Sequence, residues 1–250
     1  MKNKSVIEKI IAVLFALAVW QILAMAIGES LILVTPITVV RRLCSLIFEI
    51  DFISSVAFSF VRIVSGFIIA LIFGSVLAIF AGRFRAIDTL LWPFMTAIKT
   101  IPVASFIILC LIWLSSKNLS IFISFLMVLP IVYTNMLSGI RNTDKKLLEM
   151  TSLFRVGFFR KLKYVYLPQI YPYLISALSV SIGLSWKAGV AAEVIGIPSG
   201  SIGEKLYEAK IYLSSGDLFA WTVVIVLISI LFEKLFLFLM RQLFGRMVKS

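Results

Sequence analysis

Six long apolar runs constrain this chain more than any other feature of its sequence. Each run is long enough to cross a bilayer as an α-helix, which needs roughly 20 apolar residues. Uninterrupted runs favour helices over barrel strands, in which apolar and polar residues alternate. The predicted spans are about Val6–Ile27, Phe58–Ala81, Leu90–Leu114, Leu119–Gly139, Gln169–Ile195 and Leu218–Met240. No polar stretch is long enough for a soluble domain, so residues 1–250 are expected to form a single all-α membrane domain with six transmembrane helices.

Lysine and arginine residues predict the orientation of these spans, because basic residues collect in cytoplasmic loops. Seven of the chain's 24 Lys and Arg residues lie between spans four and five, in Arg141–Pro168. Others flank spans one, two and six on the same side: Lys2, Lys4, Arg83, Arg85, Arg241, Arg246 and Lys249. Fewer lie on the opposite side, and some of those are offset by acidic neighbours. Both termini and the segment 141–168 are therefore predicted to be cytoplasmic, and topology explains the net charge of +12 better than nucleic-acid binding does.

Span one allows two interpretations. Lys2, Lys4, an apolar run and Ala24-Met25-Ala26 are similar to a secretory signal peptide with its cleavage site. The apolar run exceeds the roughly 7–15 residues that are usual in such signals. We therefore expect an uncleaved transmembrane helix.

The stretch Leu31–Glu49 is too short to span a membrane. Pro36 is expected to end one piece of it, and Ile37–Ile50 could form an amphipathic helix on the outer membrane surface. Arg41 and Arg42 would then extend to the lipid head groups.

The segment 141–168 combines basic residues with an apolar stripe. Leu147, Met150, Phe154 and Phe158 are spaced by three, four and four residues, which predicts one face of an α-helix. A helix at a membrane surface must bury such a face in lipid or in a partner protein. The sequence alone leaves both possibilities open.

Lys99, Thr100 and Pro102 bring a charge, a hydroxyl group and a helix-kinking proline together in span three. In lipid, the carbonyl that a proline frees must find another partner. Thr100 could satisfy it while Lys99 extends to the near interface, or these residues could line a transport pathway.

Span five carries Trp186, Lys187 and Glu193. Ionisable groups inside a span are costly and often functional. Lys187 lies far from both ends of the span, so we expect it to face a polar cavity or a helix interface. Glu193 lies nearer the outer end and could be solvated there. The small residues Ala188, Gly189, Ala191 and Ala192 are expected to allow close helix packing.

Several classes of protein are excluded or disfavoured. The chain has no phosphate-binding loop of the form G-x-x-x-x-G-K-[ST], so ATP hydrolysis would need another chain. It has no His, no paired acidic motif and no Cys spacing typical of metal sites, so we expect neither catalytic nor metal-binding residues. An ion-coupled secondary transporter using Lys99, Lys187 and Glu193 remains the alternative. Such transporters are expected to have two similar halves, and the sequence shows no convincing internal repeat.

The segment 141–168 resembles the cytoplasmic insert of permease subunits of ATP-binding cassette importers. That insert has the form E-A-A, three residues, G, nine residues, I-x-L-P. Here Glu149-Met150-Thr151 occupies the first position and Val165-Tyr166-Leu167-Pro168 the last. Arg155 occupies the glycine position, with Gly157 two residues later, so the glycine and both alanines differ from the pattern. Residues 62–67, 101–102, 186–196 and 198–203 are similar to the nitrate/sulfonate/taurine branch.

This resemblance implies a type I importer permease in a bacterial cytoplasmic membrane. Two permease copies would form the pathway, two ATPase subunits would bind ATP and Mg²⁺ below them, and an external binding protein would deliver a small, possibly anionic solute. The chain itself would bind no cofactor. About 141–168 would be the coupling segment, and its contact residues would be Leu147, Glu149, Met150, Thr151, Phe154, Arg155, Gly157 and Phe158. The pathway candidates are Lys99, Thr100, Pro102, Trp186, Lys187 and Glu193.

Overall fold

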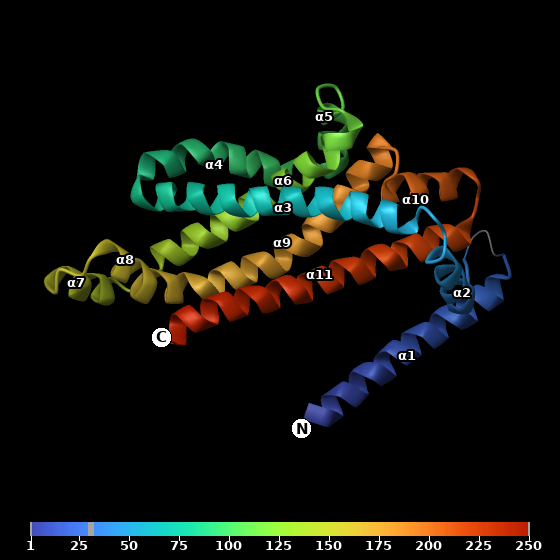
Figure 1. The fold of residues 1–250 in the computed structure, drawn as a ribbon, viewed down its shortest axis with the longest axis horizontal. Coiled ribbons are helices and arrows are strands. Elements are labelled where there is room, and N and C mark those ends of the chain that lie inside the picture. The colour runs from blue at the N-terminus through green and yellow to red at the C-terminus, as the bar shows by residue number, and fades with distance from the viewer. Residues whose placement is uncertain (1, 30–32, 250) are drawn as a thin grey trace.

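The computed structural model describes residues 2–29 and 33–249, and in this part of the chain every regular element is a helix (Figure 1). Five helices are long and apolar enough to cross a membrane, namely α1, α3, α6, α9 and α11. The elements are α1 (Lys2–Ile27), α2 (Pro36–Leu46), α3 (Phe52–Arg83), α4 (Arg85–Thr100), α5 (Val103–Cys110), α6 (Ser116–Arg141), α7 (Lys145–Leu153), α8 (Phe158–Lys161), the π-helical turn η1 (Leu162–Tyr166), α9 (Leu167–Gly196), α10 (Ile202–Ile211) and α11 (Ser215–Lys249). These helices confirm the predicted fold class, a multi-pass all-α membrane protein.

The predicted third span, Leu90–Leu114, is not one continuous helix. It is divided into α4 and α5, which meet at an angle of 105°. The cause is Pro102, which has no amide hydrogen to donate to the carbonyl of Ile98. Proline also disfavours the helical conformation of the preceding residue, and Ile101 is extended, with φ −70° and ψ 131°. Taken together, the two pieces are long and apolar enough to count as a sixth, bent span.

The core of the molecule is the packing of α3, α6 and α9 against one another. Along α3, small residues recur every four positions, at Gly66, Ala70, Gly74 and Ala78. A Cβ atom added at Gly66 would lie only 2.2 Å from the backbone oxygen of Ile121 in α6. Small residues at such a spacing allow helix backbones to approach closely in membranes. The close contact between α3 and α6 therefore depends on glycine and alanine residues, which have no side chain or only a methyl group.

The small residues of span five also pack closely, as expected. A Cβ atom added at Gly189 of α9 would lie 2.6 Å from the Ser124 Oγ of α6 and 2.7 Å from the Ile63 Cγ1 of α3. This glycine therefore lies where all three core helices meet.

Helix α2 differs from the predicted surface helix Ile37–Ile50. Pro36 begins the helix rather than ending a segment, because its missing amide hydrogen is harmless in the first turn. Thr35 is the N-cap, and its Oγ1 accepts a hydrogen bond from the amide of Thr38 at 3.3 Å. Val39 is buried, so α2 packs against the protein. Leu31, where the predicted segment starts, lies outside the described residues.

The two arginines of α2 also differ from expectation. Arg42 is not free to reach the lipid head groups, because its guanidinium group pairs with Asp217 of α11 and with Glu49, the latter at 2.9 Å. Arg41 is exposed. Two carboxylates hold Arg42 in the protein, and this arrangement joins α2 to the start of α11.

Candidate functional site

The segment 141–168, the predicted coupling segment, lies at one extremity of the molecule, where α7 and α8 extend beyond the core helices (Figure 1). The apolar stripe predicted for one helix is divided between two. Helix α7 ends at Leu153, Phe154 is its C-cap residue, and Phe158 begins α8. Through η1, α8 continues into the membrane-spanning helix α9. The single-helix prediction is therefore wrong, and the segment is a helix, a turn and an extension of α9.

The turn between α7 and α8 is a Schellman motif. The amide of Val156 donates to the carbonyl of Thr151 at 2.9 Å, and the amide of Arg155 donates to the carbonyl of Ser152 at 3.1 Å. The residue at the position of Arg155 in this motif is left-handed and is usually glycine. Arg155 has φ +48°, whereas Gly157 has an ordinary φ of −61°. Arg155 thus adopts the conformation for which glycine is favoured, and Gly157 does not replace it.

Arg155→Gly is expected to stabilise the coupling segment by about 0.5–1 kcal/mol. Relief of the left-handed conformation is worth about 1–2 kcal/mol, and the greater freedom of glycine in the unfolded chain offsets part of it. Slower amide hydrogen exchange in α7 would report the gain. Gly157→Ala is the control, since a Cβ atom at Gly157 would meet nothing within 4 Å. Faster exchange in Arg155→Gly than in the unmodified protein would contradict this explanation.

Large apolar side chains are exposed around this turn. Phe154 is 75% and Phe158 is 71% exposed, while Leu147 and Met150 are exposed to a smaller extent. The sequence analysis missed Leu153 and Phe159, which are each 83% exposed. We call these six residues the apolar tip: Leu147, Met150, Leu153, Phe154, Phe158 and Phe159. The spacing expected for one continuous helix could not have predicted that Leu153 and Phe159 are exposed together, because the turn between α7 and α8 changes the direction of the chain between them.

The other predicted coupling residues have different environments. Glu149, Arg155 and Gly157 are exposed. Thr151 is buried, and its hydroxyl donates to the carbonyl of Leu148 at 2.7 Å. Thr151 therefore supports α7 from within and does not lie on the exposed face.

Hydrogen bonds fasten the start of α7 to α9. The Gln169 Oε1 atom accepts a hydrogen bond from the amide of Asp144 at 2.7 Å. The Asn142 Nδ2 atom donates to the Tyr173 hydroxyl at 3.1 Å. Asp144 also caps α7, because its carboxylate accepts a hydrogen bond from the amide of Lys146. The tip is thus joined to a membrane-spanning helix by specific polar contacts.

Lys99, Thr100 and Pro102 are all exposed on the surface of the single chain, at the bend between α4 and α5. The Thr100 hydroxyl donates to the carbonyls of Thr96 and Ala97, at 3.1 and 3.2 Å. It therefore does not bond the Ile98 carbonyl, which is the one that Pro102 leaves without its helical donor.

In α9, Lys187 is exposed, whereas Trp186 and Glu193 are buried. Glu193 is not solvated at the outer end, contrary to expectation. Its Oε2 atom accepts a hydrogen bond from the Ser59 hydroxyl at 2.6 Å and lies 3.4 Å from the amide nitrogen of Gly203 in the first turn of α10. A carboxylate at a helix N-terminus interacts favourably with the helix dipole. Glu193 therefore joins α3, α9 and α10 inside one subunit.

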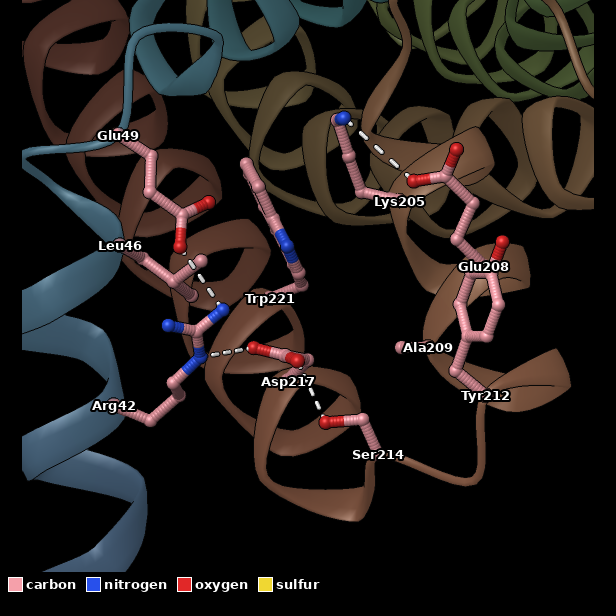
Figure 2. A pocket seen from close by; sticks show the side chains of 10 residues that line it. All are labelled: Arg42, Leu46, Glu49, Lys205, Glu208, Ala209, Tyr212, Ser214, Asp217 and Trp221. Atoms are coloured by element: carbon pink, nitrogen blue, oxygen red, sulfur yellow. Dashed lines mark hydrogen bonds and ion pairs between the residues drawn. The ribbon is translucent and has the colours of Figure 1, made fainter.

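At the end opposite the apolar tip, α2, α10 and α11 surround an open, charged pocket (Figure 2). Arg42 lies on one side with Glu49 and Asp217, and Lys205 lies on the other, 3.6 Å from Glu208. No group of three or more His, Cys, Asp or Glu residues in the described part of the chain is arranged to hold a metal ion. The pocket is therefore a polar surface of mixed charge.

Comparison with known proteins shows that this chain is similar to several transport permeases. The chain is 25% identical over 230 residues to a Bacillus subtilis protein that carries the name of an aliphatic sulfonates transport permease, SsuC, covering 91% of this chain and 83% of the relative. It is 29% identical over 202 residues to the nitrate import permease protein NrtB of Leptolyngbya laminosa, covering 74% and 69%. It is 25% identical over 190 residues to the bicarbonate transport system permease protein CmpB of Synechococcus elongatus, covering 76% and 68%.

The relatives and the helical architecture agree with the resemblance of segment 141–168 to an importer insert. A family model described as "Binding-protein-dependent transport system inner membrane component" matches residues 70–249, from the middle of α3 to the end of α11. The matched region includes the bent pair α4–α5, the apolar tip and α9. This chain belongs to the family of binding-protein-dependent transport system inner membrane components, which are transport permeases and not enzymes.

Proposed function

We propose that this chain is the transmembrane subunit of an ATP-driven importer, in which two copies form the solute pathway and two separate ATPase subunits bind ATP and Mg²⁺. The apolar tip carries this proposal. It places Leu153, Phe154, Phe158 and Phe159 on an exposed surface, and such a patch is typical of a protein interaction site. In a bacterial cytoplasmic membrane with both termini inside, the tip faces the ATPases. The coupling segment, about 141–168, then docks in them.

The charged pocket lies at the other end and therefore faces the outside in this orientation. Its mixed charges, with Arg42 and Lys205 near three carboxylates, suit contact with a polar protein surface. We propose it as part of the surface that receives the external substrate-binding protein. No nucleic-acid partner is proposed.

The solute is proposed to be a small anion. Lys99 is an exposed basic side chain in the last turn of α4, at the bend, and Lys187 is an exposed basic side chain inside α9. Cations in a low-dielectric pathway attract anions. Sulfonates, nitrate and bicarbonate, which appear in the names of the relatives, are all anions. Glu193 and Trp186, both buried, support the shape of the subunit rather than contact the solute.

Lys187→Met is expected to reduce solute uptake about ten-fold, because it removes a focusing charge while keeping the length of the side chain. Uptake of a radiolabelled anion into proteoliposomes that contain the complete complex measures the effect. Lys187→Arg keeps the charge and should retain most of the uptake, and Lys234→Met, which removes an exposed lysine near the middle of α11, is the positional control. Unchanged uptake in Lys187→Met would remove this residue from the pathway.

The proposed function is tested by expressing the tagged chain together with its genomic neighbours. A complex with an ATPase, whose hydrolysis rises when the binding protein is added, would support the importer. The alternative, an ion-coupled secondary transporter using Lys99, Lys187 and Glu193, predicts a chain that purifies alone and moves solute down an ion gradient. The burial of Glu193 in a contact between helices of one subunit argues against this relay.

A further inference from the structure

One carboxylate joins the start of α4 to the end of α6. The Asp88 Oδ1 atom accepts a hydrogen bond from the Tyr133 hydroxyl at 2.7 Å, and its Oδ2 atom accepts one from the Arg141 Nη2 atom at 2.8 Å. Tyr133 and Arg141 both belong to α6, eight residues apart, which is about two helical turns. Asp88 is therefore held from two points on the same helix, which fixes the first turn of α4 against the last turns of α6.

This contact is better suited to transmitting movement than to stabilising the fold. The Asp88 and Arg141 side chains are partly exposed, and ion pairs of that exposure contribute little to folding. Tyr133 is buried, and Asp88 provides the hydrogen-bond partner that a buried hydroxyl needs. A buried donor combined with a charged donor gives the linkage a defined direction and geometry.

Arg141 is also the last residue of α6 and the first residue of the coupling segment. Asn142 and Asp144, which follow it, bond to Tyr173 and Gln169 of α9. Consecutive residues at the base of α7 therefore contact two different elements: α4 through Arg141, and α9 through Asn142 and Asp144. Those two elements carry Lys99 and Lys187.

Helix α4 is otherwise loosely held. Leu90, Trp92 and Phe94 are exposed, and Met95 is its one fully buried side chain. At its other end α4 stops at the 105° bend, where its residue Ile98 packs against the cluster that includes Ile107 of α5. Helix α4 is thus held near the bend by this cluster and at its start by the Asp88 contact, which is where a tilt of α4 would be driven.

We propose that Arg141, Asp88 and Tyr133 are positioning residues that transmit movement of the coupling segment to α4, and thereby move Lys99 at the bend. This inference rests on the proposed importer function. None of the three residues touches solute or nucleotide in this proposal. They act by fixing the angle of α4 relative to the base of α7.

The test uses the complete complex with its ATPases and binding protein, and compares Asp88→Arg, Arg141→Asp and the double exchange. Solute taken up per ATP hydrolysed is the readout, because a purely structural role would alter complex yield instead. Each single variant is expected to lower this ratio at least about three-fold. The double exchange restores an ion pair with the charges reversed but not the bond from Tyr133 to a carboxylate, so it should recover part of the ratio.

Arg83→Asp is the matched control. It reverses a charge just before α4, and Arg83 forms no ion pair with any other residue that the structure describes. If a single exchange prevents assembly, Tyr133→Phe and Asp88→Asn probe the same ratio with smaller changes and should each lower it. An unaltered ratio in those variants, or a double exchange no better than the single ones, would overturn the linkage. In either case, coupled transport by the unmodified complex shows that the importer function itself stands.

Discussion

Phe154→Asp is expected to separate the ATPase subunits from this chain. Phe154 is 75% exposed at the turn between α7 and α8, in the middle of the apolar tip. Aromatic anchors at the centre of an interface are worth roughly 2–4 kcal/mol, so their loss weakens binding by about 30-fold or more. The new carboxylate adds a desolvation cost if the interface still closes. Co-purification of the ATPase with the tagged chain, and the ATPase activity of the purified membrane fraction, measure the loss.

The matched control is Phe48→Asp. Phe48 is 87% exposed, but it lies just after α2, at the end of the molecule opposite the tip. This variant should leave the ATPase bound, so the pair separates a docking defect from a general effect of introducing a charge on an exposed aromatic. Full ATPase recovery with Phe154→Asp would show that the tip docks elsewhere, for example on lipid head groups.

The spans could be predicted because the bilayer requires apolar helices of a minimum length. The same criterion could not predict the bend in span three. Pro93 lies inside α4 and Pro130 inside α6, and both helices continue past these prolines, whereas α4 ends at Thr100, two residues before Pro102. Apolar content is similar around all three prolines, and the result depends on the packing around each one. The break at Pro102 depends on the packing of α5 against α6 and α9, which the sequence alone does not give.

The location of the coupling segment stays a prediction, and the helical periodicity of this segment was misjudged. Spacings of three and four residues suit one helix, and they persisted by coincidence across the turn at Arg155. A glycine there would have indicated the helix end. With arginine in the left-handed position, sequence propensity and structure disagree, so Leu153 and Phe159 were missed.

Glu193 shows a different limit of the sequence. An ionisable residue near the end of a span can be solvated, can line a pathway or can bind another helix, and its position in the span does not distinguish these. Its partners, Ser59 and Gly203, are 134 and 10 residues away. Such contacts could be predicted only if the positions of α3 and α10 relative to α9 were known.

Gly66→Ala is expected to destabilise the chain by about 3 kcal/mol, because there is no room for one methyl group between α3 and α6. The added Cβ atom would lie 2.2 Å from the Ile121 backbone oxygen and 2.9 Å from the Ser124 Cβ. A side-chain end could rotate away, but a helix backbone cannot, so the two helices must separate along a contact that runs through the core. Thermal unfolding in detergent, followed by size-exclusion chromatography, should show a clearly lower midpoint.

Gly183→Ala provides the comparison, since it makes the same change in a spanning helix where a Cβ atom would meet nothing within 4 Å. Alanine has the higher helix propensity, by about 1 kcal/mol, so this variant should be as stable as the unmodified chain or more so. Gly82→Ala should be intermediate, because its added atom would meet the Ile140 Cγ2 at 2.8 Å, and that side chain can move. The order Gly66, Gly82, Gly183 from most to least destabilised follows from what the added Cβ atom would meet: a backbone atom, a movable side chain or nothing. Equal midpoints for Gly66→Ala and Gly183→Ala would mean that α3 and α6 do not pack as closely as described.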